Sequence, residues 1–280
     1  MKMIILDSRK IKDFERYLND EERSVATIEK YIRDVQSFYT FAEEKEISRQ
    51  TVLDYKSSLV ENYAVTSANS MIAALNCFFR FCGWQELCVK QYKIQRAAYC
   101  SEDKELTREE YLRLLNSANE RHNERINLII QTICGTGIRV SELQYITVES
   151  LKCGEAIVCC KGKTRRIFIV SALRKKLLRY VNTQGIVSGS VFVTKSGKPV
   201  SRISVWKDMK ALCEMANVSP SKVFPHNLRH LFARCFYNIE KDIAKLADIL
   251  GHSNINTTRV YIVTTGTEHK RRMEKMRLII

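Results

Sequence analysis

Apolar side chains recur every three or four residues along most of this chain, and that spacing limits most strongly what it can fold into. Ile28, Tyr31, Val35 and Phe38 repeat in this way, with Ser24 placed to start a helix before them. Such a period belongs to one buried face of an α-helix and not to a strand. With 45% hydrophobic residues, the chain also has enough apolar surface for a stable core. We therefore predict a mainly α-helical fold.

The same period marks further helices in the first hundred residues. We expect short ones around residues 11–18 and 51–60, and a longer one that starts at the capping candidates Thr66-Ser67 and ends before Gly83. The apolar face of the longer helix consists of Met71, Leu75, Phe79 and Cys82. These stretches predict a small N-terminal module of helices.

The boundary between two domains is expected near residue 100. Residues 96–104 mix charged and small side chains without apolar periodicity, as linkers do. Thr107-Arg-Glu-Glu110 then has the capping-box pattern of a helix start. We predict a helical domain over residues 1–95 and a second domain over 105–280 that ends in a tail helix.

One part of the second domain has the period of strands. Residues 156–160 and 166–170 are rich in β-formers and flank the basic run Lys161–Arg165, which indicates a hairpin with a positively charged tip. Residues 191–193, before the turn formers of 196–199, are expected to add a third strand. The fold class is thus mainly α with a small β-sheet, the second domain being α+β.

Positive charge is concentrated in the second domain. The whole chain carries a net charge of +15. Residues 1–100 hold 15 basic and 14 acidic side chains, whereas residues 101–280 hold 31 and 17, a net charge of +14. A surface of this kind attracts phosphate and favours a nucleic-acid partner, since each neutralised phosphate releases counterions. A basic surface that is merely solvated is the alternative.

Membrane, disulfide and metal classes are disfavoured. The most apolar stretch, residues 126–138, is interrupted by polar side chains, and the apolar start of the chain meets Asp7 at once. Ten cysteines are scattered without any C-x-x-C pair, so we expect buried, small hydrophobic side chains and no zinc site. A cytoplasmic protein without membrane contact is expected.

Four segments of the second domain contain the side chains that phosphodiester chemistry needs. In chain order they supply Arg139 with Glu142, Lys161, His226 with Arg229, and His252 with Tyr261. Each residue alone has an ordinary explanation, such as a surface arginine, a residue after a helix-capping glycine, or a half-buried aromatic. For Glu142 a purely structural role is as plausible as a functional one. The combination is what points to catalysis.

Cleavage of a phosphodiester by transesterification requires a nucleophile, stabilisation of charge on the phosphate oxygens, and a proton for the leaving oxygen. A free phenol, with a pKa near 10, is only about one-thousandth ionised at pH 7, so Tyr261 needs a neighbouring base or positively charged surroundings. Arg139 and Arg229 can grip two phosphate oxygens through their planar guanidinium groups. Glu142, one helical turn from Arg139, can orient that guanidinium or a nearby histidine.

These segments resemble the conserved boxes of the tyrosine recombinases, site-specific DNA recombinases that include phage integrases and Xer proteins. Gly-Thr-Gly-Ile-Arg139-Val-Ser-Glu-Leu resembles the first box, and Pro-His226-Asn-Leu-Arg229-His the second, with its His-x-x-Arg core. Leu-Gly-His252 followed by Tyr261 nine residues later resembles the third. Lys161 lies 22 residues after Arg139 in a Lys-Gly-Lys hairpin, as in the Xer branch. The order and spacing of the boxes make a chance match very improbable.

The resemblance implies a role for each residue. Tyr261 would form a 3′-phosphotyrosyl bond, Lys161 would protonate the departing 5′ oxygen, His226 would handle the proton of the nucleophile, and His252 would donate a hydrogen bond to the phosphate. Lys163, Arg165 and Arg166, in the same basic hairpin, are predicted to bind DNA. Leu231 and Arg234 depart from the small hydroxyl residues common after the second box, which affects packing or DNA contacts rather than chemistry.

At the level of the whole protein, the resemblance implies a helical core-binding domain followed by a catalytic domain. It also implies a homotetramer on double-stranded DNA with recombination sites, a Holliday-junction intermediate, and no need for ATP, metal or another cofactor. The tail, residues 268–280, would dock on the neighbouring subunit. DNA recombination or integration is the expected activity.

Three other functions remain open at this point. A type IB topoisomerase uses the same chemistry but relaxes supercoils without exchanging strands between sites. A metal-dependent nuclease or transposase needs clustered carboxylates, and residues 101–280 contain only four aspartates. A DNA-binding regulator would bind without cleaving.

Overall fold

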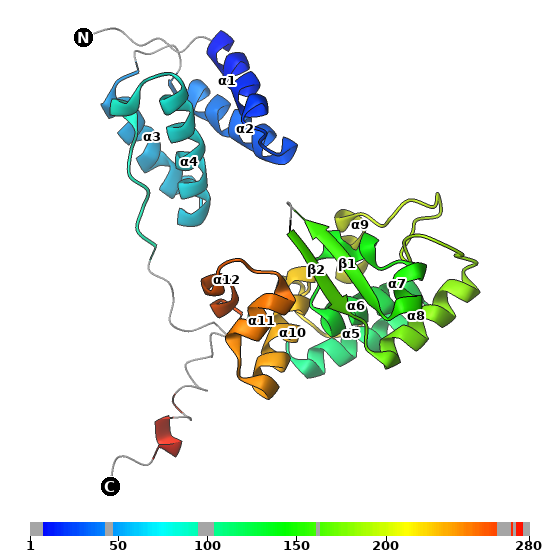
Figure 1. Cartoon of the computed structure of the whole chain (residues 1–280). Helices are drawn as coiled ribbons and strands as arrows, with labels where there is room; N and C mark the ends of the chain where they lie inside the picture. The colour runs from blue at the N-terminus through cyan, green and yellow to red at the C-terminus, as the bar shows by residue number, and fades with distance from the viewer. Residues whose placement is uncertain are drawn as a thin grey trace. The chain divides into compact units, whose positions relative to one another are not determined.

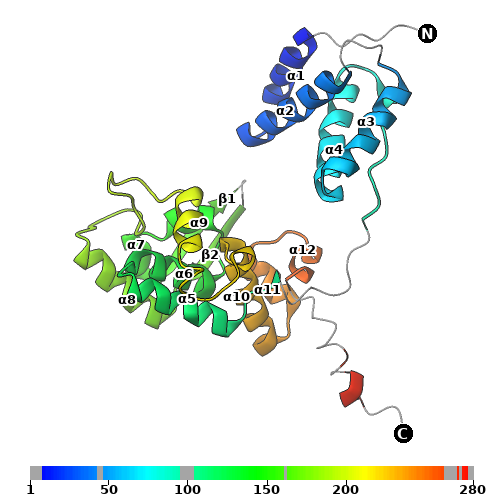
Figure 2. The same cartoon turned by 180° about the vertical axis from the view of Figure 1, so that it is seen from behind.

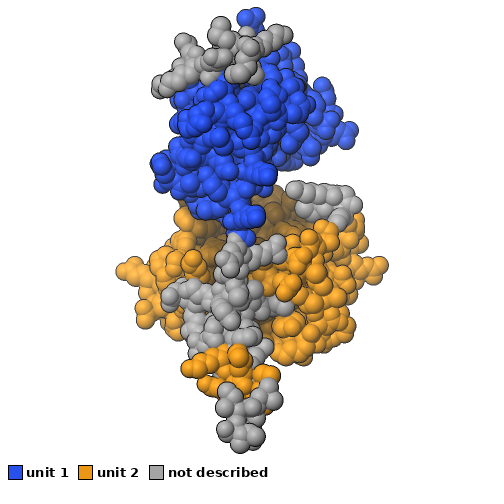
Figure 3. Space-filling model, turned by 90° about the vertical axis from the view of Figure 1, so that its left-hand side faces the viewer, with its two compact units in different colours: residues 1–96 blue, residues 97–280 orange. Residues whose placement is uncertain are grey.

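The computed structural model describes residues 8–42, 47–94, 104–160, 163–261, 270 and 273–276. The chain divides into two compact units, residues 1–96 and 97–280, coloured blue and orange in Figure 3. Each unit has its own hydrophobic core. Within the described residues, no helix is both long enough and apolar enough to cross a lipid bilayer.

Unit 1 is built from four helices, as the apolar period predicts. They are α1 (Ser8–Asp20), α2 (Val25–Ala42), α3 (Arg49–Asn62) and α4 (Val65–Phe81), followed by the 3-10 turn η1 (Gln85–Leu87). Fully buried aromatic rings fill the centre, where Phe14 meets Phe78 edge to face at 5.2 Å and Phe38 meets Phe79 at 5.7 Å between ring centroids. Aromatic pairs of this geometry add stabilisation beyond the area they bury.

The predicted N-cap of α4, Thr66 or Ser67, is wrong by two to three residues. The helix begins at Val65 with Ala64 as N-cap, and no side chain accepts a hydrogen bond there, so Thr66 and Ser67 lie inside the first turn. Burial of the apolar face formed by Ala68, Ile72 and Leu75, rather than a cap, stabilises this end.

Unit 2 is organised around one buried helix. Helix α6 (Glu124–Thr136) packs against α5 (Arg108–Glu120), α8 (Ser171–Thr183), α9 (Arg202–Lys210) and α10 (Pro225–Glu240). The predicted capping box is confirmed, because Glu110 donates its backbone N–H to the Thr107 hydroxyl while its carboxylate accepts from the Thr107 N–H. The remaining elements are η3 (Val140–Tyr145), α7 (Val148–Cys153), η4 (Pro220–Lys222), α11 (Ile243–Leu250) and α12 (Ile255–Arg259).

The sheet is a two-stranded hairpin within the described residues. Strands β1 (Glu155–Cys160) and β2 (Lys163–Phe168) pair antiparallel, with Val158 opposite Arg165. The hairpin and α9 lie on opposite sides of unit 2, as the two views in Figures 1 and 2 show. Residues 161 and 162, which connect the two strands, lie outside the described residues.

The third strand predicted over residues 191–193 is not formed. Val193 makes only an isolated bridge to Pro199, and Ser190 another to Thr147. Proline has no N–H to continue a ladder, and both Val191 and Phe192 are buried in the core instead of alternating between two faces.

The cysteines differ from the expectation of burial. The eight cysteines whose side chains are described are free thiols, and of these only Cys213 is fully buried, whereas Cys153, Cys159 and Cys235 are exposed. Most of the predicted tail, including residues 268–269 and 277–280, lies outside the described residues.

Candidate active site

Tyr261 lies directly after α12, in a small apolar cluster. Its side chain is 5% exposed and packs with Ala233, Leu246 and Leu250 from α10 and α11. Three histidine rings surround it, with centroids 5.5 Å away for His226, 4.3 Å for His230 and 5.4 Å for His252. The phenol is therefore held in a defined position beside several nitrogen bases.

His226 is the histidine bonded to that phenol. It lies in the first turn of α10, which Pro225 starts with its fixed backbone angle, and its Nε2 is 3.3 Å from the Tyr261 Oη. Partial burial, together with the charges of Arg229 and Arg139, lowers the pKa of His226 below 6.5. The ring is thus neutral at pH 7 and can accept the phenol proton.

Arg229, one turn further along α10, is completely buried. Its Nη1 donates to the Gly137 carbonyl, and its Nη2 donates to the Leu250 carbonyl at 2.6 Å. Burial and the nearby Arg139 lower the pKa of Arg229 to about 10, which leaves it charged at pH 7. Its Nε is buried without a hydrogen-bond partner among the described residues.

His252 connects Arg229 to α12. It follows Gly251, which ends α11 in the left-handed conformation. Its Nε2 lies 3.0 Å from Arg229 Nη2 and its Nδ1 lies 2.9 Å from the Thr258 hydroxyl. Since the guanidinium can only donate, Nε2 accepts and Nδ1 carries the ring proton. Burial, followed by the charge of Arg229, lowers the pKa of His252 to about 4, so the ring is neutral.

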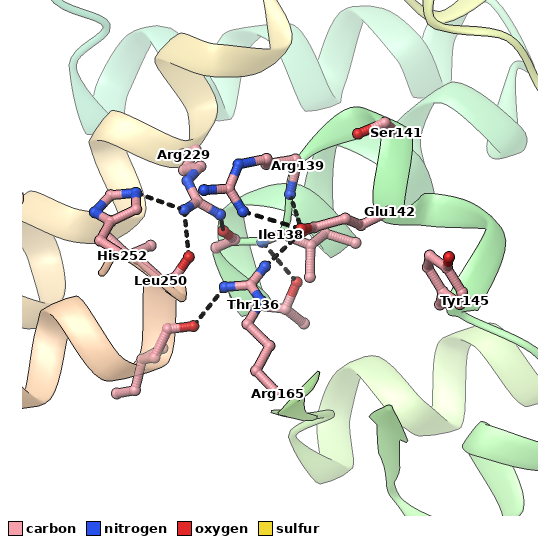
Figure 4. A network of polar contacts seen from close by, with 12 residues as sticks. Thr136, Ile138, Arg139, Ser141, Glu142, Tyr145, Arg165, Arg229, Leu250 and His252 are labelled. Atoms are coloured by element: carbon pink, nitrogen blue, oxygen red, sulfur yellow. Dashed lines mark hydrogen bonds and ion pairs between the residues drawn. The ribbon is translucent and has the colours of Figure 1, made fainter. Parts of the chain in front are cut away.

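Arg139 is positioned by Glu142 at the start of η3. The buried Glu142 carboxylate accepts from the Arg139 backbone N–H at 2.7 Å and from its Nη1 at 3.0 Å. Arg165, on β2, donates to the same carboxylate from the other side and to the Ile249 carbonyl at 2.7 Å. Figure 4 shows these groups converging from η3, β2, α10 and the end of α11.

The end of α6 lies close to this network because its backbone packs tightly against α10 and α11 at Gly137. Gly137 ends α6 with φ +66°, and a Cβ there would lie 2.4 Å from Phe232 and 3.2 Å from Leu250. The absence of a side chain lets the Gly137 carbonyl reach Arg229.

A cavity of about 500 Å³ is bordered by Arg139 and His226, with the buried Arg229 behind its wall. Its wall also includes Arg202 and Trp206 from α9. A phosphate and its flanking sugars are small enough to enter such a space. Because Arg229 has no exposed surface, direct contact with a phosphate requires its neighbours to shift.

The structure brings together five of the six residues to which a catalytic role was assigned, namely Arg139, His226, Arg229, His252 and Tyr261. Lys161 lies outside the described residues, and of Lys163 only the backbone, paired with Cys160, is described. Arg166 is exposed beside Glu155, 3.8 Å away, whereas Arg165 faces inward with a side chain only 13% exposed.

Sequence reasoning missed His230, Thr258, Arg202 and Trp206. His230 had a usable signal, because it lies four residues after His226 and thus on the same helix face. The contact of Thr258 with His252, and the approach of α9 to the cavity, arise only from tertiary packing. Among the described residues, no three histidine, cysteine or carboxylate side chains gather into a group that could hold a metal ion.

Comparisons with known proteins agree with the geometry. The model of the phage integrase family matches residues 104–267, and that of the phage integrase N-terminal SAM-like domain matches residues 11–86. The tyrosine recombinase XerA of Thermococcus kodakarensis is 30% identical over 96% of this chain and 95% of its own length. The tyrosine recombinase XerD of Halalkalibacterium halodurans is 30% identical over 86% of this chain and 88% of its own.

Solved structures show the same fold. A lambda integrase dimer bound to a COC′ core site aligns with a TM-score of 0.75 at 16% identity, over 93% of this chain and 78% of that one. The XerH recombinase bound to its difH substrate aligns with a TM-score of 0.70 at 18% identity, over 95% and 84%. By sequence and by fold, this chain belongs to the phage integrase family and is a tyrosine recombinase.

Proposed function

We propose that this enzyme cleaves and rejoins duplex DNA at specific sites through a 3′-phosphotyrosyl intermediate on Tyr261. The observation that carries the proposal is the 3.3 Å contact between the Tyr261 phenol and His226, beside two arginines. A phenol oxygen attacks the phosphorus, the bond to the 5′ oxygen breaks, and the DNA strand leaves with a 5′ hydroxyl. Attack by a 5′ hydroxyl of another strand reverses these steps and rejoins the DNA.

His226 takes the proton from the nucleophile. Its lowered pKa keeps Nε2 free to accept at pH 7, and the existing hydrogen bond already defines the path of that proton.

Arg139 and Arg229 stabilise the charge that grows on the phosphate oxygens. Arg139 is 38% exposed and needs no rearrangement to reach a phosphate in the cavity. Arg229 must exchange one of its present acceptors for a phosphate oxygen. If Arg229 turns from His252 toward the phosphate, His252 Nε2 is released, and a change of tautomer makes it the hydrogen-bond donor that the family resemblance implies.

Lys161 is proposed as the acid that protonates the leaving 5′ oxygen, on the strength of the family motif. Each cleavage and rejoining step exchanges one phosphodiester for another. The bond energy is kept in the protein–DNA link, so the reaction needs neither ATP nor a metal.

The partner is double-stranded DNA that carries recombination sites. The net charge of +14 on residues 101–280 favours phosphate binding, with Lys163 and Arg166 as proposed contacts. A lambda integrase tetramer has been solved on a Holliday junction, and it aligns with this chain at a TM-score of 0.74. We extend that assembly to this enzyme as a homotetramer that acts on DNA in the cytoplasm.

The two family models support a proposal for the roles of the domains. Residues 1–95 are proposed to be the core-binding domain and residues 105–280 the catalytic domain, joined by the linker 96–104.

A nicked substrate tests the proposal. Duplexes tiled across the DNA that flanks the gene are first screened for specific binding, and the bound ones are then nicked just beyond the scissile position so that the released fragment diffuses away. The wild-type enzyme should accumulate a covalent complex with the 3′ end in the presence of a chelator, and Tyr261→Phe should not. Specific binding without a covalent complex would identify a regulator instead.

A second assay separates recombination from relaxation. Plasmids with two copies of the bound sequence should exchange strands, whereas plasmids without it should remain supercoiled. Relaxation of any plasmid, with no exchange, would indicate a type IB topoisomerase.

A further inference from the structure

Arg165 connects three segments of the site that lie far apart in the sequence. From β2, its Nη2 bonds the Glu142 carboxylate of η3, 23 residues away, and its Nη1 bonds the Ile249 carbonyl of α11, 84 residues away. Two nitrogens of one guanidinium thus hold two different elements (Figure 4). A guanidinium presents its donors in a rigid plane, so both elements are fixed relative to each other.

The Arg165 side chain also sets the position of the turn that precedes His252. A Cβ on Gly251 would lie 2.6 Å from Arg165 Cδ and 3.1 Å from its Nε, so the turn before His252 rests directly on the Arg165 side chain. The glycine is needed both for its φ of +65° and for this close approach.

Arg165 also shares with Arg139 the Glu142 carboxylate to which both arginines are bonded. The Glu142 carboxylate is almost fully buried, with Arg139 Nη1 on Oε1 and Arg165 Nη2 on Oε2. With Arg165 present, the carboxylate is shared between two cations, and Arg139 can keep part of its guanidinium directed to the cavity. Without Arg165, a buried carboxylate would have Arg139 as its remaining ion-pair partner among the described residues and would draw it inward.

We propose that Arg165 is a positioning residue for strand cleavage rather than a DNA contact. It holds Arg139 through Glu142 and His252 through the end of α11, so that both face one phosphate. This inference rests on the proposed function. A misplacement of catalytic groups by about 1 Å can slow a reaction about a hundredfold without weakening substrate binding.

The test compares Arg165→Lys and Arg165→Ala with the wild-type enzyme on the nicked substrate. Lysine keeps the positive charge but cannot make two bonds in fixed directions. Both variants should therefore cleave about 10- to 100-fold more slowly in a single turnover, while their DNA affinity and its salt dependence stay within about twofold of wild type.

Arg174→Ala serves as the matched control. Arg174 also spans backbone carbonyls in unit 2, to Leu151 at 2.5 Å and Lys152 at 2.7 Å, but it belongs to neither the cavity wall nor the Glu142 network. Its loss should lower the melting temperature and leave the cleavage rate at the wild-type level. Should Arg165→Ala unfold at the assay temperature, Arg165→Lys carries the comparison.

Two results would overturn the inference. Normal cleavage by both Arg165 variants would remove the positioning role. Loss of DNA affinity in Arg165→Ala, with affinity and rate both restored by Arg165→Lys, would show that Arg165 acts through its charge on DNA. The wild-type enzyme tests the proposed function separately. If it forms no covalent complex, the proposed function itself fails, whatever the Arg165 variants show.

Discussion

At the scale of single residues, burial keeps the histidines around Tyr261 neutral. It lowers the pKa of His230 to about 4, as it does that of His252, and it lowers the pKa of His226 as well. Positive charges of Arg229 add to this effect. The phenol therefore meets proton acceptors at neutral pH, in a region where the positive charges of Arg139, Arg165 and Arg229 outweigh the negative charge of Glu142.

This protonation state predicts how stability depends on pH. The unfolded chain binds a proton on each histidine near pH 6.5, whereas folded His230 and His252 bind theirs near pH 4. The part of the free energy of unfolding that depends on these two histidines is complete above pH 6.5. It is lost as the pH falls toward 4, because the unfolded state binds more protons in that window. The melting temperature of the DNA-free protein should therefore decrease as the pH is lowered from 6.5 to 4.

His230→Gln provides the comparison for that measurement. Removing one of the two groups should reduce the slope of the free energy of unfolding by up to about 1.4 kcal/mol per pH unit. An unchanged slope would mean that His230 titrates alike in both states.

Arg139 gives a second prediction at this scale. Arg139→Ala should slow cleavage by about a hundredfold or more, equivalent to roughly 3 to 4 kcal/mol, if it acts as a preorganised donor to the transition state. DNA affinity, measured in parallel at constant salt, should change far less. A variant that binds weakly but cleaves normally once bound would assign Arg139 to binding.

Motifs predict the residues that meet at Tyr261, because residue type and spacing are visible in the sequence. The inward position of Arg165 was accessible too, since it shares the two-residue period of the buried Ile167 and Ile169. Its partners were not, because Glu142 and Ile249 reach it only through the packing of η3 and α11 around β2.

At the scale of elements, the end of α6 sets the position of the arginines. Gly137 has a left-handed backbone and lies against Phe232. Gly137→Ala should therefore cause both backbone strain and a steric clash with Phe232. Gly185 has the same φ of +66°, but a Cβ there would meet no other described residue within 4 Å beyond its chain neighbours. Gly185→Ala is therefore the matched control.

The two alanine variants should differ measurably in stability. Gly185→Ala should cost about 1 to 2 kcal/mol for the backbone alone, whereas Gly137→Ala should cost about 2 to 5 kcal/mol because overpacking adds to it. Denaturant unfolding of both proteins measures the difference. Equal losses of stability would show that the Phe232 ring can move aside at no cost. The close packing of Gly137 against Phe232 would then not be required.

Helix periodicity predicted the elements of unit 1, and the capping box predicted the start of α5, whereas two local expectations failed. The start of α4 and the missing third strand both depend on burial, of Ala68 and Ile72 in one case and of Val191 and Phe192 in the other. Local turn and capping signals cannot report which side chains the rest of the fold will cover.

At the scale of the whole molecule, charge and chemistry coincide in one unit. Residues 101–280 carry a net charge of +14 together with every residue of the candidate site, whereas residues 1–100 are nearly neutral. The uneven charge was visible in the sequence and indicated a phosphate-rich partner. The assembly on DNA depends on surfaces between protomers, which a single chain does not define.

Mapping the covalent attachment tests the central claim most directly. A nicked duplex labelled on the strand that retains the 3′ phosphate is trapped with the wild-type enzyme and digested, and the nucleotide-bearing peptide is sequenced by mass spectrometry. The label should be found on the peptide that contains Tyr261, linked through its phenol oxygen to a 3′ phosphate. A nucleotide attached to any other residue, or through a 5′ phosphate, would contradict the account.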